Sequence, residues 1–206
     1  MLLRPYTAYK KKNSKLRGML FKLLFSSRRL VVGRGFECDT FPSLLVDEGC
    51  IISIGDNVLF RRDVEIRVHS GSTLIIGNNV RIDRGVRLLV TNRSKIGLAD
   101  GVRIGLYSVL NAGESITVGK NALISGFVYL QTSMHAHGKG LSIQEQGFSH
   151  APIVLEDDTW LGAHVVVLPG CTIKEGSIVG SNAVVTKSIE KGKIYGGVPA
   201  KILNER

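Results

Sequence analysis

The fold is decided by the segment from Leu155 to Glu190, which divides without a gap into six hexapeptides: LEDDTW, LGAHVV, VLPGCT, IKEGSI, VGSNAV and VTKSIE. Each begins with an aliphatic residue and carries a small or β-branched residue at its fifth position. The first positions are Leu155, Leu161, Val167, Ile173, Val179 and Val185, and the fifth positions are Thr159, Val165, Cys171, Ser177, Ala183 and Ile189. A period of six fits neither an α-helix nor an isolated hairpin, so the pattern indicates a stacked repeat.

The same phase occurs earlier, in blocks that begin at Ile54, Ile76, Ile104 and Val118, and the gaps between the blocks predict loops at corners. We interpret each hexapeptide as one short strand plus one corner. Three hexapeptides close one turn of a prism, and successive turns stack as parallel strands about 4.8 Å apart. The aliphatic positions point inward, and glycine and asparagine supply the positive φ that tight corners require. Cys171 is then a small interior residue and not a nucleophile.

The length of 206 residues suits one domain, and the chain holds three widely spaced cysteines, Cys38, Cys50 and Cys171. This spacing gives neither a disulfide framework nor a CxxC metal site, which favours a reducing cytoplasm. No stretch approaches the roughly 18 apolar residues that a membrane-spanning helix needs.

The charge is concentrated at one end of the chain. Lys and Arg number 27 against 17 Asp and Glu, and residues 1–34 hold ten basic residues and no acidic one. The remainder is balanced, which disfavours a nucleic-acid-binding fold, because that class carries its basic charge on the folded surface. We therefore predict a basic segment over 1–34 and a β-helix domain over 35–203.

Within the basic segment, apolar residues recur at the spacing of one helix face, with Lys15, Arg17 and Lys22 off that face. The apolar positions are Leu16, Met19, Leu20, Leu23 and Leu24. Two interpretations stay open. The helix covers the open end of the prism or packs on a neighbouring subunit, or it contacts anionic lipid at the inner face of the membrane.

The segments GAHVVVLPGCTIKEGSIVGSNAVVTKSI and YGGVPAKIL resemble the left-handed parallel β-helix acyltransferases. Within that superfamily the chain is most similar to the galactoside, maltose, xenobiotic and capsular-polysaccharide O-acetyltransferases. The resemblance covers about residues 50–203. It implies an all-β, left-handed parallel β-helix, a homotrimer with active sites between neighbouring prisms, and acetyl-CoA as the acetyl donor, with no metal.

One long segment, residues 131–152, departs from the repeat and predicts a protruding loop with three of the five histidines. By resemblance, QTSMH places the general base at His135, with His137 as the alternative. A sugar hydroxyl needs a base to attack a thioester near pH 7, and neutral imidazole, with a pKa near 6.5, suits that task. We interpret His69, His150 and His164 as structural or surface residues.

The resemblance also places the donor and acceptor sites. The donor residues are Trp160, Ala163, Ser181, Thr186, Lys187 and Lys201. For the acceptor, a polar side chain one turn before the histidine is expected, and YSVLNAGES suggests Asn111 with Glu114 behind it.

The resulting hypothesis is a cytoplasmic O-acetyltransferase that uses acetyl-CoA and a sugar hydroxyl of a bacterial surface polysaccharide or its precursor. Serine and nucleotide-sugar acyltransferases are the enzyme alternatives. A non-catalytic β-helix scaffold, or a metal-binding relative of the γ-carbonic-anhydrase type with ligands from His135, His137 and His164, is the alternative from another class.

Overall fold

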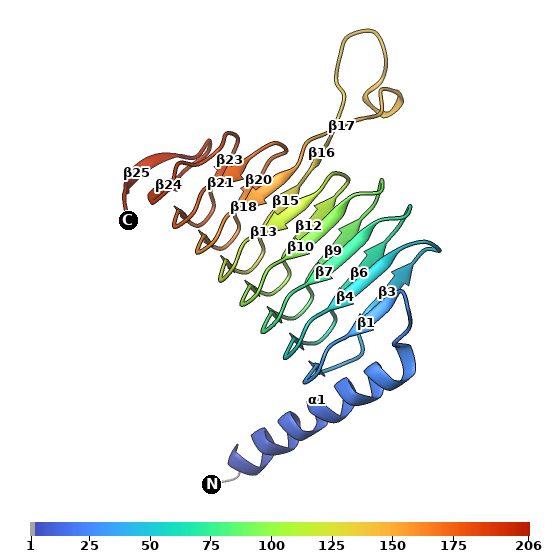
Figure 1. Cartoon of the computed structure of the whole chain (residues 1–206). Coiled ribbons are helices and arrows are strands. Elements are labelled where there is room, and N and C mark those ends of the chain that lie inside the picture. The colour runs from blue at the N-terminus through green and yellow to red at the C-terminus, as the bar shows by residue number, and fades with distance from the viewer. Residues whose placement is uncertain (1–2) are drawn as a thin grey trace.

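The computed structural model describes the backbone of residues 3–206 and the side chains of residues 13–206. One long helix, α1 (Leu3–Phe25), precedes a stack of strands that forms a three-sided prism (Figure 1). The side chains of Arg4, Lys10, Lys11 and Lys12, which belong to the predicted basic segment, lie outside the described residues.

Three long sheets form the sides of the prism. Sheet A contains β1 (Leu30–Val32), β4 (Ile51–Ile54), β7 (Thr73–Ile76), β10 (Lys95–Leu98), β13 (Ile116–Val118), β18 (Ile153–Leu155) and β21 (Thr172–Ile173). Sheet B contains β2 (Glu37–Cys38), β5 (Leu59–Phe60), β8 (Arg81–Ile82), β11 (Arg103–Ile104), β14 (Leu123–Ile124), β19 (Trp160–Leu161), β22 (Ile178–Val179), β24 (Lys193–Gly196) and β25 (Lys201–Glu205). Sheet C contains β3 (Ser43–Val46), β6 (Glu65–Val68), β9 (Arg87–Val90), β12 (Val109–Ala112), β15 (Tyr129–Gln131), β20 (Val166–Val167) and β23 (Val184–Val185).

The chain passes through sheets A, B and C in turn, so seven coils are stacked from β1–β3 to β21–β23. Neighbouring strands within the three sheets are parallel, apart from the terminal pair β24 and β25. The first coil begins at Leu30, because β1 pairs with β4 in register Leu30↔Ile52. Leu30 lies inside residues 1–34, which the sequence predicted to be a separate basic segment.

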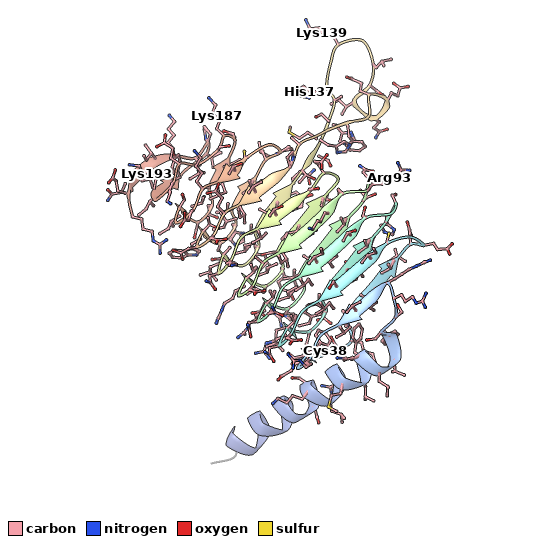
Figure 2. The ribbon with its side chains drawn as sticks, viewed as in Figure 1. Cys38, Arg93, His137, Lys139, Lys187 and Lys193 are labelled. Carbon is pink, nitrogen blue, oxygen red and sulfur yellow. The ribbon has the colours of Figure 1, made fainter. Side chains whose placement is uncertain are left out.

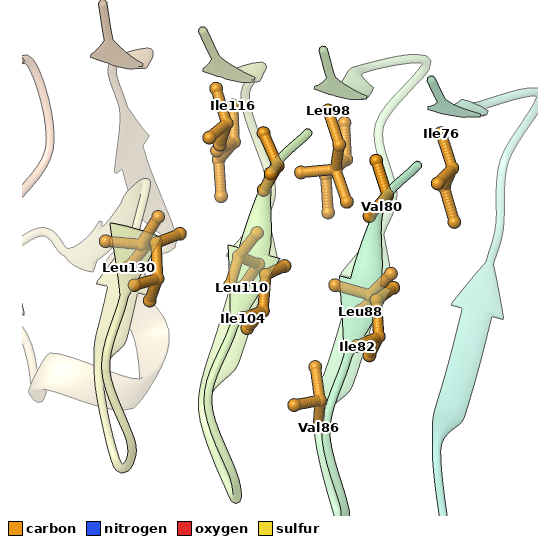
Figure 3. Close-up of a cluster of buried hydrophobic side chains, with 14 of the residues drawn as sticks. Ile76, Val80, Ile82, Val86, Leu88, Leu98, Ile104, Leu110, Ile116 and Leu130 are labelled. Carbon is orange, nitrogen blue, oxygen red and sulfur yellow. The ribbon is translucent and has the colours of Figure 1, made fainter. Parts of the chain in front are cut away.

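The predicted interior is confirmed. All twelve first and fifth positions of the hexapeptides between Leu155 and Glu190 are buried, with at most 2% of each residue exposed. The same inward columns continue through the earlier coils, where Leu88, Leu110 and Leu130 lie one above another on sheet C (Figure 3). Aliphatic side chains therefore fill the prism along its whole length.

The sequence predicted that the gaps in the hexapeptide pattern are loops at corners. The structure shows longer strands in these gaps instead. Every corner from β4 to β9 has four residues, as do the corners in the last two coils. The additional residues lengthen the strands of sheets A and C to four residues, with two inward side chains in place of one, as in β6, where Ile66 and Val68 are buried. The early coils consequently repeat every 22 residues, as in Ile52↔Leu74↔Ile96, against 18 in Val154↔Thr172.

The corners use the backbone conformation that the sequence predicts. Each corner between sheets A and B has one residue at positive φ, namely Gly35, Asn57, Asn79, Gly101, Asn121, Asp158 and Gly176. Between sheets B and C, every corner after the first coil likewise has one residue at positive φ, and three of these residues carry rings, namely Tyr107, Phe127 and His164. The Phe127 and His164 rings stack with centroids 4.8 Å apart, which gives His164 a structural contact, as expected.

Helix α1 lies across the N-terminal end of the prism (Figure 1). Phe21 is buried there, with its ring centroid 5.4 Å from that of Phe36, and Ser14 Oγ donates a hydrogen bond to Glu37 Oε2 at 3.2 Å. Gly18 allows the close approach, since a Cβ at that position would lie 1.9 Å from the Phe36 carbonyl oxygen. The helix therefore covers the open end of the core.

The predicted helix is confirmed, but the face that covers the core is not the predicted apolar one. Leu16, Met19, Leu20, Leu23 and Leu24 are all exposed, and the contact is made by Ser14, Gly18 and Phe21 instead. In the described residues, no helix is both long enough and apolar enough to span a bilayer.

Substituting Gly18 by Ala is expected to lower the thermal unfolding midpoint, because the added methyl group would collide with backbone atoms of Phe36. In a helix that touched nothing, the same change would stabilise by about 1 kcal/mol, because alanine has the higher helix propensity. Differential scanning calorimetry of this variant beside Met19→Ala, at an exposed position of the same turn, gives the comparison. A raised midpoint for Gly18→Ala would mean that α1 does not pack on the prism.

Candidate active site

The predicted loop projects from the edge between sheets C and A, between β15 and β18 (Figure 1). It is not irregular throughout. Strands β16 (Ser133–His135) and β17 (Phe148–His150) pair as an antiparallel hairpin, and a short 3-10 helix, η1 (Ile143–Glu145), lies towards its tip. The hairpin holds its side chains in fixed positions relative to the prism edge.

Thr132 anchors the base of the hairpin. Its buried hydroxyl accepts hydrogen bonds from the backbone N–H groups of Gly113, at 2.9 Å, and Glu114, at 3.0 Å. The same hydroxyl donates to the Asn111 carbonyl oxygen at 3.0 Å. Three hydrogen bonds from one side chain tie the start of the loop to the preceding coil, so the hairpin leaves the prism in a defined direction.

His135, the predicted base, ends β16 and is exposed. Its ring packs against Phe148 on the facing strand, with ring centroids 4.1 Å apart. Among residues 13–206, whose side chains the structure describes, none donates or accepts a hydrogen bond at the His135 imidazole. His137 is also exposed, and its Nδ1 lies 3.2 Å from the His135 carbonyl oxygen.

His150, which the sequence analysis interpreted as a structural or surface residue, also lies on the hairpin. His150 faces Ser133 across the strands, with Nδ1 and Oγ 2.8 Å apart, and both pack against Gly113. A Cβ on Gly113 would lie 2.1 Å from Ser133 Oγ. The similar triplets SMH and FSH on either side of the loop are the only sequence signal of this pairing.

The two predicted acceptor residues lie next to the hairpin base. On sheet C, the Asn111 side-chain amide donates to Gln131 Oε1 at 3.2 Å and to the Tyr129 hydroxyl at 3.4 Å. The Gln131 amide in turn donates to the Ser133 carbonyl oxygen at 2.6 Å. Glu114 is turned back on the chain, and its Oε1 accepts from the Ser115 N–H at 2.8 Å. A polar surface rich in hydrogen-bonding groups therefore adjoins the hairpin.

The predicted donor residues fall into two groups. Thr186 and Lys187 occupy the corner that follows β23, on the same edge as the hairpin, where Figure 2 shows Lys187 and His137. The other group, Trp160, Ala163, Ser181 and Lys201, lies on sheet B or at the corner between sheets B and C. One chain thus does not bring its sheet B residues to its own hairpin.

Trp160 projects outward from β19 and is partly exposed. Its indole Nε1 donates to Ser125 Oγ at 3.1 Å, which fixes the ring against the preceding coil. Lys201 begins β25, which returns antiparallel to β24 at the C-terminal end of the prism. Trp160 and Lys201 are both exposed on sheet B.

The cysteines are interior residues, as predicted for Cys171. All three are free thiols and buried. Burial raises the pKa of the Cys38 thiol to about 11 and also raises the pKa of the Cys171 thiol. A thiol that stays protonated at neutral pH is a poor nucleophile, so Cys38 and Cys171 fit a packing role in the interior.

The remaining histidines are held by structural contacts. His69 Nδ1 lies 2.9 Å from Asp47 Oδ1, and the hydrogen bond from His69 holds the pKa of Asp47 below its usual range. His164 lies at a corner of sheets B and C, away from the edge that carries His135 and His137. Among the side chains of residues 13–206, no group of three or more His, Cys, Asp and Glu is placed to hold a metal ion.

Comparisons with known proteins agree with the repeat. The sequence family described as "Bacterial transferase hexapeptide (six repeats)" matches residues 152–187. Galactoside O-acetyltransferase of Escherichia coli is 34% identical over 91 residues, which cover 44% of this chain and 44% of that protein. The putative colanic acid biosynthesis acetyltransferase WcaF of Escherichia coli is 36% identical over 103 residues, which cover 50% and 52%. The matched part thus spans about half the length of these curated relatives.

The solved structures that are similar include the following two. A hexapeptide-repeat-containing acetyltransferase of Vibrio cholerae, complexed with acetyl coenzyme A, is 30% identical, with 63% of this chain and 69% of that chain covered and a TM-score of 0.58. A mutant of AntD, an N-acyltransferase from Bacillus cereus, in complex with dTDP-4-amino-4,6-dideoxyglucose and coenzyme A, covers 92% and 89% with a TM-score of 0.65 and 23% identity. The second likeness shows the fold, which is the predicted left-handed parallel β-helix.

Proposed function

Because the chain belongs to the bacterial hexapeptide-repeat transferases, we propose that it moves an acetyl group from acetyl-CoA to a sugar hydroxyl of a bacterial surface polysaccharide or its precursor. The observation that carries this proposal is an exposed histidine on a hairpin that is tied to the prism edge. The descriptions of the galactoside and colanic acid relatives support a saccharide acceptor.

In this proposal His135 is the general base. Its imidazole takes the proton of the acceptor hydroxyl as the hydroxyl oxygen attacks the thioester carbonyl carbon. A tetrahedral oxyanion forms, and a backbone N–H beside the thioester stabilises it. The carbon–sulfur bond then breaks, the imidazolium returns the proton to the thiolate of coenzyme A, and the acetyl ester leaves. His137 is the alternative base.

The acceptor is proposed to lie over sheet C beside the hairpin, where Asn111, Gln131 and Tyr129 present amide and hydroxyl groups. These groups both donate and accept, which suits sugar hydroxyls. Glu114 stands behind Asn111, at the corner that follows β12. The hairpin wall formed by Phe148 and His135 would cover one side of the sugar ring.

The donor is proposed to contact Trp160, Ala163 and Ser181 of one prism and the hairpin of another, because these residues lie on different sides of one chain. This arrangement fits a homotrimer with active sites between neighbouring prisms. Lys201 and Lys187, with Thr186, would bind the phosphates of coenzyme A, as ammonium groups commonly do. A reducing cytoplasm suits the three free thiols.

The test is a coupled assay that measures thiol release from acetyl-CoA with a panel of acceptors and identifies the product by mass spectrometry. We expect thiol release to require a saccharide and the acetyl group to appear as an ester. The panel includes serine and a nucleotide-linked amino sugar, because the AntD complex holds an acceptor of that class. Transfer to nitrogen would replace the O-acetyltransferase proposal, and failure to bind coenzyme A at millimolar concentration would refute transferase activity altogether.

A further inference from the structure

One face of α1 carries five large apolar side chains that are exposed. We call Leu16, Met19, Leu20, Leu23 and Leu24 the leucine face; their exposed fractions are 54, 69, 42, 80 and 64%. Four of them, Leu16, Met19, Leu20 and Leu23, line an apolar depression on the helix surface together with Lys22 and Ser26. Five large apolar side chains on one side of a helix form a contiguous patch, and such patches mark interaction sites.

No residue in 13–206, the part of the chain whose side chains are described, covers the leucine face. The opposite side of α1 is already packed on the prism through Gly18 and Phe21. The Phe21 ring contacts Phe25, Phe36 and Phe41, with centroid separations of 5.0, 5.4 and 5.8 Å. Turning the helix to cover the leucines would expose this aromatic cluster, so the partner of the leucine face must come from outside the chain.

The charge around the leucine face identifies the partner. Residues 1–34 contain ten basic residues and no acidic one. Of those whose side chains are described, Lys15, Arg29 and Arg34 approach acidic residues of the prism. Arg17 and Arg28 form no ion pair with any residue in 13–206, so their charge remains available to an anionic surface.

A second copy of the chain is a poor occupant on the same grounds. Two leucine faces pressed together would bring two basic segments into contact, and like charges in a partly desolvated interface oppose association. A surface with an apolar interior and a negatively charged boundary would complement both the leucine face and the basic side chains around it. An anionic lipid bilayer has that composition.

We propose that α1 binds the surface of an anionic bilayer, with the leucine face in the boundary between headgroups and acyl chains and the neighbouring Lys and Arg side chains at lipid phosphates. The helix lies in the plane of the surface, and the N-terminal end of the prism faces the lipid (Figure 1). This inference goes beyond acetyl transfer and does not depend on it.

Vesicle co-sedimentation of the purified full-length chain tests the proposal. The two vesicle types are phosphatidylcholine alone and an equal mixture with phosphatidylglycerol. We expect apparent affinity to be at least about tenfold higher for the anionic vesicles and to fall at high salt, where screening shortens the reach of charge. Binding that is absent at low salt, or equal for both vesicle types, would overturn the proposal.

Two matched variants test whether vesicle binding depends on the leucine face in particular or on exposed leucines anywhere on the chain. The triple change Leu16→Gln, Leu20→Gln and Leu23→Gln should lower binding to anionic vesicles at least about tenfold. The control changes three exposed leucines elsewhere on the chain, Leu106→Gln, Leu123→Gln and Leu203→Gln, and should leave binding unchanged. Circular dichroism and the unfolding midpoint verify that both variants are folded.

Light scattering distinguishes the competing occupant. If the leucine face joins copies of the chain, the triple variant will have a smaller mass than the wild type, which would overturn the lipid proposal. An unchanged mass together with reduced vesicle binding supports it.

Discussion

Replacement of His135 by Ala is expected to lower kcat for acetyl transfer by about 100- to 10,000-fold, the usual contribution of a positioned general base. The KM for acetyl-CoA and the unfolding midpoint should stay close to those of the wild type. The reason is the position of the side chain, which is exposed and contacts Phe148 on the hairpin, so its removal leaves no interior cavity. Steady-state kinetics with thiol detection, together with calorimetry, measures both quantities.

The other hairpin histidines provide the controls. His137→Ala removes a ring whose Nδ1 lies against the His135 carbonyl oxygen, and a loss of less than about tenfold is expected, well below that of a general base. His150→Ala breaks the contact with Ser133 Oγ at the hairpin base and should alter KM for the acceptor more than kcat. If His135→Ala keeps its activity and one of the other two variants loses it, the general base is that other histidine.

Leu110→Ala is expected to cost about 2–5 kcal/mol of unfolding free energy, the range for a leucine removed from a packed core. Leu110 is fully buried in β12 and lies between Leu88 and Leu130 in the column of sheet C (Figure 3). Both neighbours lose contacts when its side chain is shortened, and a stack of parallel strands has little freedom to close the cavity. Urea unfolding followed by circular dichroism measures the change.

Leu123→Ala is the matched control, because Leu123 is a leucine of similar height in the prism that points outward from sheet B. Its cost should be below about 0.5 kcal/mol, as for most surface substitutions. Similar losses for Leu110→Ala and Leu123→Ala would contradict the assignment of inward and outward positions.

The prism was predictable from sequence because its period is strict where the strands are shortest. In the last two coils the first and fifth residues of every hexapeptide point inward, so the period of six is unbroken there. The wider coils have the same architecture, but their sequence does not show it as a period of six. Adding one inward and one outward residue to a strand keeps the alternation of faces but breaks the count of six, so Ile66 and Val68 appeared to lie in gaps.

The helix shows a different limit. Its existence followed from spacing, yet the face that packs on the prism contains a serine, a glycine and one phenylalanine. Close approach at Gly18 and the fit of Phe21 beside Phe36 decide that contact, and both depend on the shape of the surface that receives them. The stripe of leucines predicts the helix, but it does not predict which side of the helix packs on the prism.

At the candidate site, the position of the loop followed from the interruption of the repeat, but its internal structure did not. Pairing Ser133 with His150 closes a long excursion of the chain, and no local pattern fixes such a register. The roles of His135, Asn111 and the donor residues stay predictions, since they depend on ligands and on the surface of a second prism.

The separation between α1 and the hairpin is set by the prism itself. The helix covers the first coil and the hairpin leaves the fifth, so four steps of about 4.8 Å place the hairpin about 19 Å from that end. Because the early coils are in register at 22-residue intervals, deleting residues 73–94 would pair β4 with β10 and keep every side chain on its face. The distance between α1 and the hairpin along the prism axis can therefore change only in steps of one whole coil.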